Sequence, residues 1–199
     1  STNTDRRLLS SSTLASACDE GEDVATWAMG NAAWNAGNHT NTNFPWDEDC
    51  RFYLRNHTMR VANLILKRIH EVPFDEGDPD FNKRTTGEAY FMRAMLLWEG
   101  VYRYGGMPIV RDVIDPTDFS QRPRNSFSDC IDSILIDCDR ATQYLPDYYT
   151  DNAKLGRATR IAALALKARV LLYAASPLFN TSTPYMSFPG HEDLIGYGN

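Results

Sequence analysis

The segment Gly87–Val110, GEAYFMRAMLLWEGVYRYGGMPIV, constrains the fold of this chain more than any other. On a helix its apolar residues form two adjacent stripes, one of Tyr90, Ala94, Leu97, Val101 and Tyr104 and one of Phe91, Met95, Trp98 and Tyr102. Two stripes make a helix apolar over most of its circumference, so one neighbouring surface cannot bury it. Gly105 and Gly106 can turn left-handed at its end, and Pro108 prevents it from resuming. We therefore predict a central helix with helices packed on two sides.

Three further helical patterns flank this segment. The first is opened by Phe44-Pro45-Trp46-Asp47 and should end near Val72. Its apolar face runs through Leu54, Thr58, Val61, Ile65, Ile69 and Val72. The second opens at Ser126, which with Asp129 resembles a capping box, and Pro146 stops it. The third, rich in alanine, runs from about Ala158 to Ala175.

The connecting segments show no alternating strand pattern. Residues 73–86 read as a polar loop, and we expect Thr85 or Thr86 to cap the central helix. Residues 1–20 fit a short helix, and residues 180–199 have no period. The predicted fold class is all-α, with helical hairpins of tetratricopeptide-like type and long irregular loops, although no 34-residue repeat can be demonstrated.

Length and charge exclude several classes of protein. The 199 residues are enough for one domain with a core, and the net charge of −6 argues against a nucleic-acid partner. No transmembrane segment is predicted. Residues 6–18 superficially resemble a lipoprotein signal ending at Cys18, but serines interrupt their short apolar stretch, so a helix or loop inside the fold is preferred.

Cysteine and histidine spacings predict no metal and no cofactor. There is no CxxC, and Cys130 and Cys138 lie about 12 Å apart along a helix, beyond the reach of a disulfide. A Cys18–Cys50 bridge stays open. The four histidines have no metal-ligand spacing, which favours solvated or lightly packed rings.

Four blocks of the chain resemble the SusD/RagB family of outer-membrane nutrient-binding lipoproteins. They are Cys18-Asp19-Glu20, the stretch from Tyr53-Leu54-Arg55 to Arg60-Val61-Ala62-Asn63, the segment Gly87–Val110, and the stretch from Gly156-Arg157-Ala158 to Ser176-Pro177-Leu178-Phe179-Asn180. The resemblance implies a helical tetratricopeptide-type scaffold, anchored by lipid at the cell surface of the outer membrane, that captures glycan for a SusC-like TonB-dependent transporter. It also implies that residues 1–199 are a single helical domain at the N-terminal side of a longer protein.

The Trp- and Asn-bearing region 24–46 is the predicted ligand site. Sugar recognition uses aromatic faces against ring CH groups and planar polar side chains for hydroxyls. The candidate residues are Trp27, Asn31, Trp34, Asn35 and Trp46. The family places part of its glycan site at about the position of Trp27 and Asn31. The alternative is that Trp27 and Trp34 are core residues.

Two other functions compete with glycan capture. A tetratricopeptide-type scaffold could bind a protein or peptide, and some family members are thought to serve peptide uptake. A glycan-degrading enzyme would need two carboxyl groups across a cleft. Asp47, Glu48 and Asp49 are adjacent at a helix start, where acids favour the helix dipole, so no enzyme activity and no catalytic residue is predicted.

Overall fold

Helices are the only regular elements in the part of the chain that the structure describes. A computed structural model describes residues 52–115, 117–118 and 120–197. Within these residues the α-helices are α3 (Phe52–Arg68), α4 (Phe81–Tyr104), α5 (Phe127–Tyr144) and α6 (Arg160–Ala174), with 3-10 turns η2 (Ile69–Glu71), η3 (Asn152–Lys154) and η4 (Glu192–Leu194). The all-α prediction is confirmed. No described helix has the length and apolarity needed to cross a membrane.

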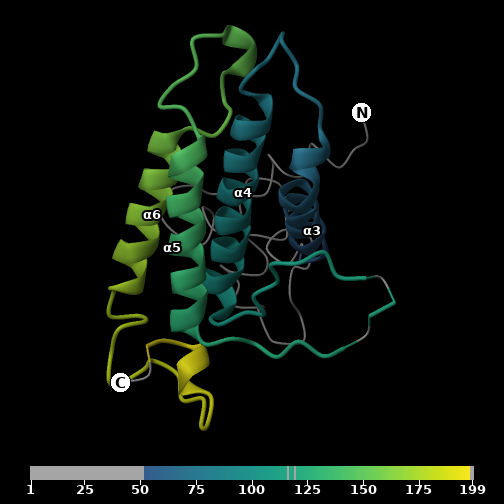
Figure 1. Cartoon of the computed structure of the whole chain (residues 1–199). Coiled ribbons are helices and arrows are strands. Elements are labelled where there is room, and N and C mark those ends of the chain that lie inside the picture. Colours follow the sequence, from purple (N-terminus) through teal and green to yellow (C-terminus); the bar gives the residue numbers. More distant parts are fainter. Residues whose placement is uncertain (1–51, 116, 119, 198–199) are drawn as a thin grey trace, which may run out of the picture. The chain divides into compact units, whose positions relative to one another are not determined.

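Helix α4 is the packing centre of the compact unit that begins at Arg55. It lies between α3 and α5, and α6 packs along α5 and also reaches α4 (Figure 1). Its side chains Ala94, Leu97, Trp98 and Val101 are all buried. They share one core with α5 and α6 residues, among them Phe127, Ile131, Ile134, Cys138, Val170 and Ala174. The prediction of a central helix with neighbours on two sides is therefore confirmed.

The start of α4 differs from the prediction. The helix begins at Phe81 rather than near Gly87, and neither predicted threonine caps it, since the N-cap residue is Asp80. The Thr86 hydroxyl instead donates to the Asn82 carbonyl within the helix, at 2.8 Å. Arg84, one turn inside the helix, pairs with Asp78 of the preceding loop. This ion pair between residues six positions apart stabilises a first helical turn that the spacing of apolar residues does not predict.

The buried face of α3 is also rotated from the predicted one. Val61, placed on the apolar stripe, is 38% exposed, whereas the next residues, Ala62 and Asn63, are buried. The side-chain amide of Asn63 donates to the main-chain carbonyls of Val110 and Asp112, at 3.0 and 3.3 Å. A polar residue thus takes the core position because the chain leaving α4 supplies acceptors for it.

The predicted ends of α5 and α6 agree with the structure. Ser126 caps α5, accepting a hydrogen bond from the Asp129 amide at 3.0 Å, and the helix ends just before Pro146. Helix α6 occupies most of the predicted range, and the Thr159 hydroxyl caps it by accepting from the Ala162 amide. Both hairpin connections, α3 to α4 and α5 to α6, lie at the same end of the helices, at the top of Figure 1.

The two glycines after α4 bring three chain segments together at the opposite end. Gly105 has a φ of 75°, as its predicted helix-ending role requires. A Cβ on Gly105 would stand 2.1 Å from the Leu194 carbonyl oxygen, and one on Gly106 2.1 Å from that of Asn125. The Gly106 amide donates to Leu194 at 2.6 Å. Although residues 180–197 have no period, their last part is held against the helices: Leu194 is buried, and the Tyr197 ring packs edge-on against Phe127 of α5 with ring centroids 5.4 Å apart.

Candidate functional site

A buried ionic network joins the family-like motifs of α3 and α4. The Arg93 guanidinium donates to both carboxylate oxygens of Asp137 on α5, at 2.7 Å each, and to Asn63 on α3 at 3.0 Å. Arg111, beyond α4, approaches the same carboxylate at 3.3 Å and donates to the Ser133 hydroxyl at 2.7 Å. The motif residues Arg93 and Asn63 therefore fix the helices relative to one another, and are not open to a ligand.

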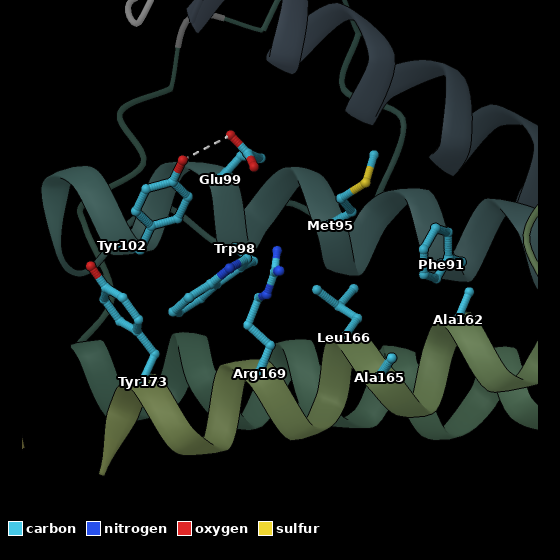
Figure 2. A pocket seen from close by; sticks show the side chains of 10 residues that line it. All are labelled: Phe91, Met95, Trp98, Glu99, Tyr102, Ala162, Ala165, Leu166, Arg169 and Tyr173. Atoms are coloured by element: carbon cyan, nitrogen blue, oxygen red, sulfur yellow. Dashed lines mark hydrogen bonds between the residues drawn. The ribbon is translucent and has the colours of Figure 1, made fainter. Parts of the chain in front are cut away.

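An interhelical groove of about 650 Å³ runs along α4 and α6 on the side away from α5 (Figure 2). Its α4 side is made by Phe91, Met95, Trp98, Glu99 and Tyr102, and its α6 side by Ala162, Ala165, Leu166, Arg169 and Tyr173. Most of these side chains are apolar. Apart from the adjacent pairs Trp98–Glu99 and Ala165–Leu166 they recur every three or four residues, which places them along one face of each helix.

The polar and aromatic groups of this groove are mostly engaged within the protein. Glu99 is paired with Arg103 and approached by Arg55 at 3.8 Å, and it accepts from the Tyr102 hydroxyl. Trp98 meets Tyr102 and Tyr173 with ring centroids 5.3 Å from each. Few flat ring faces or hydrogen-bonding groups are left for a hydroxyl-rich ligand.

A second hollow, the loop-end pocket of about 270 Å³, lies where the two hairpin connections meet. The loop before α4 and the first turn of α4 contribute Asp78, Asp80, Lys83 and Arg84; the α5–α6 connection and the end of α5 contribute Tyr144, Leu145, Pro146, Tyr148, Tyr149, Thr150, Asp151 and Lys154. Tyr148 is 73% exposed, so a face of its ring is open to solvent.

Charged side chains at the loop-end pocket are fixed by one another. Arg84 donates to both oxygens of Asp78, at 3.0 and 2.6 Å, and Lys154 reaches the same carboxylate at 3.4 Å. The hydrogen bond from Arg84, with its positive charge and that of Lys154, lowers the pKa of Asp78 from 3.8 to about 2. The carboxylate is thus ionised at neutral pH, beside two cations and an exposed aromatic ring.

The residues predicted from sequence to bind ligand, Trp27, Asn31, Trp34, Asn35 and Trp46, lie outside the described residues, so they stay predictions. Asp47, Glu48, Asp49, Cys18 and Cys50 lie outside them as well. The loop-end pocket was not predicted. Its one sequence signal is the pair Tyr148-Tyr149 in the turn between Pro146 and Gly156, because aromatic residues are unusual in a solvated connection.

Cysteines and histidines in the described part agree with their predicted structural roles. Cys130 and Cys138 are free and buried, and burial raises the pKa of the Cys138 thiol to about 12. His57, His70 and His191 are exposed. No cluster of potential metal ligands occurs among the described residues.

The fold and its motif network define a class of helical-hairpin proteins, and comparison with known proteins identifies the family within it. The model of the SusD-like family whose description is "Starch-binding associating with outer membrane" matches residues 9–172. That range covers most of the chain. The protein belongs to the SusD-like family, as its four sequence blocks indicated.

Solved structures support this assignment. A SusD-like protein from Bacteroides fragilis NCTC 9343 is 41% identical over 58% of this chain and 22% of its own, with a TM-score of 0.53. The protein BT4246 is 29% identical over 84% and 28%, with a TM-score of 0.69. A laminarin binding SusD-like protein is 27% identical over 58% and 24%, with a TM-score of 0.52.

These relatives are much longer than the chain. It spans 22–28% of the length of the three structures. None of the curated proteins compared with the chain matches it.

Proposed function

We propose that the protein to which this chain belongs captures oligosaccharide at the outer membrane and delivers it, without cleaving it, to a SusC-like TonB-dependent transporter. The observation that carries the proposal is membership of a family described as starch-binding and outer-membrane-associated. The laminarin binding relative supports a glycan as the ligand. In this proposal residues 1–199 form a single helical domain on the N-terminal side of a longer, lipid-anchored protein.

The loop-end pocket has the side chains that a sugar ring needs. An exposed tyrosine face can stack on the CH surface of a pyranose, as the open ring of Tyr148 allows. Carboxylates and ammonium groups beside it can accept from and donate to hydroxyls, and charged groups make the stronger hydrogen bonds. Lys83, Asp80 and Asp151 line the same pocket and supply these groups. We assign one sugar-binding position to it.

The Trp- and Asn-bearing region remains part of the proposal as a second ligand-contacting segment. Trp27, Trp34 and Trp46 would supply stacking faces, and Asn31 and Asn35 would supply amides for hydroxyls. Replacing Trp27 with alanine in the full-length protein should weaken glycan binding about tenfold or more, because a large ring face is lost.

Isothermal titration of the full-length protein against a panel of oligosaccharides tests the function. We expect saturable binding of at least one glycan, with no release of reducing sugar during the titration. Binding of peptides but of no saccharide would overturn the proposal and favour a peptide-binding scaffold instead.

A matched pair of tyrosine variants tests the loop-end pocket. Tyr148→Ala should weaken glycan binding about three- to tenfold, equivalent to about 0.7–1.4 kcal/mol, because one stacking face is removed. Tyr185 is similarly exposed, at 80%, and lies outside this pocket, so Tyr185→Ala should leave affinity unchanged. Equal affinities for the two variants would exclude the pocket while leaving glycan capture intact.

Transporter partnership is tested separately. A tag on the full-length protein, expressed in its own cells, should copurify a TonB-dependent transporter from detergent-solubilised outer membranes. Recovery of the protein without any such transporter would count against delivery, whatever the result of the titration.

A further inference from the structure

The loop-end pocket offers more unengaged positive groups than unengaged negative ones. Its charged side chains balance formally, and they are Asp78, Asp80, Asp151, Lys83, Arg84 and Lys154. Both terminal nitrogens of Arg84 donate to Asp78. Asp151 accepts from the Ala153 amide at 2.9 Å and caps η3. Asp80, whose side chain makes no capping hydrogen bond to α4, is the remaining carboxylate of the pocket.

Two lysines supply the unengaged positive charge. Lys83, in the first turn of α4, is exposed and pairs with no carboxylate of the described residues. Lys154 lies 3.4 Å from Asp78, but Arg84 already holds that carboxylate at 3.0 and 2.6 Å. The pocket therefore has two ammonium groups for one unengaged carboxylate, and an anionic group that enters it is favoured over a cationic one.

The start of α4 adds donors to the same pocket. The aligned peptide dipoles of this 24-residue helix place partial positive charge at its N-terminus. The backbone N–H groups of a first turn have no partner within the helix, and the Asp80 side chain does not cap them. Because Asp80, Lys83 and Arg84 all line the pocket, these groups lie where anions bind at helix starts.

Arg84 has one donor that the described residues do not use. Its side chain is only 6% exposed, and its Nε has no hydrogen-bond partner among them. A buried N–H without an acceptor is unfavourable, so an acceptor bound beside Arg84 gains a hydrogen bond. The pKa of Asp78, lowered to about 2 mainly by the hydrogen bond from Arg84, shows that this place stabilises a carboxylate as an anion.

We propose that the loop-end pocket binds a sugar ring that carries an anionic group, either the carboxylate of a uronic acid or a sulfate ester. The assignment rests on the glycan capture proposed above. The exposed ring of Tyr148 packs on the sugar, and Lys83, Lys154 and the start of α4 hold its charge. The volume of about 270 Å³ is below the roughly 300–1,000 Å³ of sites that enclose a drug-sized ligand, so the pocket suits a single ring.

Matched charged and neutral oligosaccharides test the charge preference in the full-length protein. Isothermal titration compares oligouronides with their carboxyl-reduced counterparts, and sulfated oligosaccharides with their desulfated counterparts. We expect the charged member of at least one pair to bind about tenfold tighter, and to bind more weakly as NaCl is raised. The pair that shows the preference separates carboxylate from sulfate.

The other outcomes of this titration are distinct. If neutral oligosaccharides bind as tightly as their charged counterparts, or more tightly, the charge preference is wrong and glycan capture stands. If no saccharide of either kind binds, the charge preference and the proposed function are both overturned.

A matched pair of lysine variants ties the preference to the loop-end pocket. Lys83→Met and Lys67→Met each remove one positive charge from an exposed helical position, but Lys67 does not line the pocket. Lys83→Met should weaken binding of the preferred charged oligosaccharide about threefold or more, because one ion pair is lost, and Lys67→Met should not. Neither variant should alter the affinity for the neutral counterpart. Equal affinities of the two variants for the charged oligosaccharide would contradict the assignment to this pocket.

Discussion

At the scale of single residues, the motifs that identify the family serve packing. Arg93 and Asn63 are buried and meet in one network with Asp137. Gly105 and Gly106 permit backbone contacts that no side chain could fit. The residue types at these positions are therefore required by the fold, and they say little about which ligand the protein binds.

Removing the carboxylate of this network should cost much of the stability of the protein. Asp137→Ala leaves the guanidinium of Arg93 buried without its charge partner, which costs about 3–5 kcal/mol. Urea denaturation followed by circular dichroism measures the loss. The exposed pair Arg122–Asp118 provides the control, and Asp118→Ala should change stability little. Comparable losses for the two variants would contradict the role given to the network.

Replacement of Gly106 should be more harmful than replacement of Gly156. A Cβ on Gly106 collides with the Asn125 carbonyl, so backbone must move. A Cβ on Gly156 meets nothing within 4 Å, and only its φ of 85° opposes alanine, at about 1 kcal/mol. Thermal melts of Gly106→Ala and Gly156→Ala should show the larger fall for Gly106→Ala. The opposite order would contradict the close approach of the three segments.

At the scale of elements, the α3–α4 and α5–α6 connections meet at one end because both hairpins run in the same direction. That meeting brings Asp78 and Lys154, far apart in sequence, within 3.4 Å of each other. The same meeting creates the loop-end pocket. Helix α4 is lengthened at this end by the Arg84–Asp78 pair, which explains why its start precedes the predicted one.

The pairing of Asp78 should make stability depend on pH in acid. Its folded pKa, about 2, lies below the ordinary 3.8, so the folded state binds this proton less readily. The contribution of the ionised Asp78 to the stability of the folded state is therefore present above about pH 4 and is lost as the pH falls towards 2. Asp78→Asn should lower the Tm at pH 6, and its difference from wild type should shrink near pH 2.5. A difference that stays constant would show that Asp78 is not the responsible group.

At the scale of the whole molecule, the described helices bury one face of α6 and leave apolar side chains exposed on another. These side chains, Ile161, Leu164, Leu171 and Leu172, form the α6 outer stripe. Because dispersed apolar residues are normal on a surface but continuous stripes are not, the stripe is the feature of this chain most in need of a partner.

A protein limited to residues 1–199 should show the effect of leaving the α6 outer stripe exposed. If produced in folded form, it should bind the dye 8-anilinonaphthalene-1-sulfonate more strongly than the full-length protein and should self-associate in size-exclusion chromatography. Leu172→Glu should reduce both effects, because it places a charge in the stripe, whereas Met186→Glu should not. Weak dye binding by a monomeric chain would contradict this picture.

The sequence by itself determined the helical class, the family, the order of the elements, and the caps at Ser126 and the end of α4. These features depend on contacts between residues a few positions apart, which periodicity and capping patterns record directly. Only the tertiary structure decided that Asn63 rather than Val61 faces the core, that the Tyr-Gly-Gly turn binds Leu194, and that Tyr148 and Asp78 line one pocket. Each of these depends on segments that are distant in sequence, and local spacing carries no information about which distant partner a residue meets.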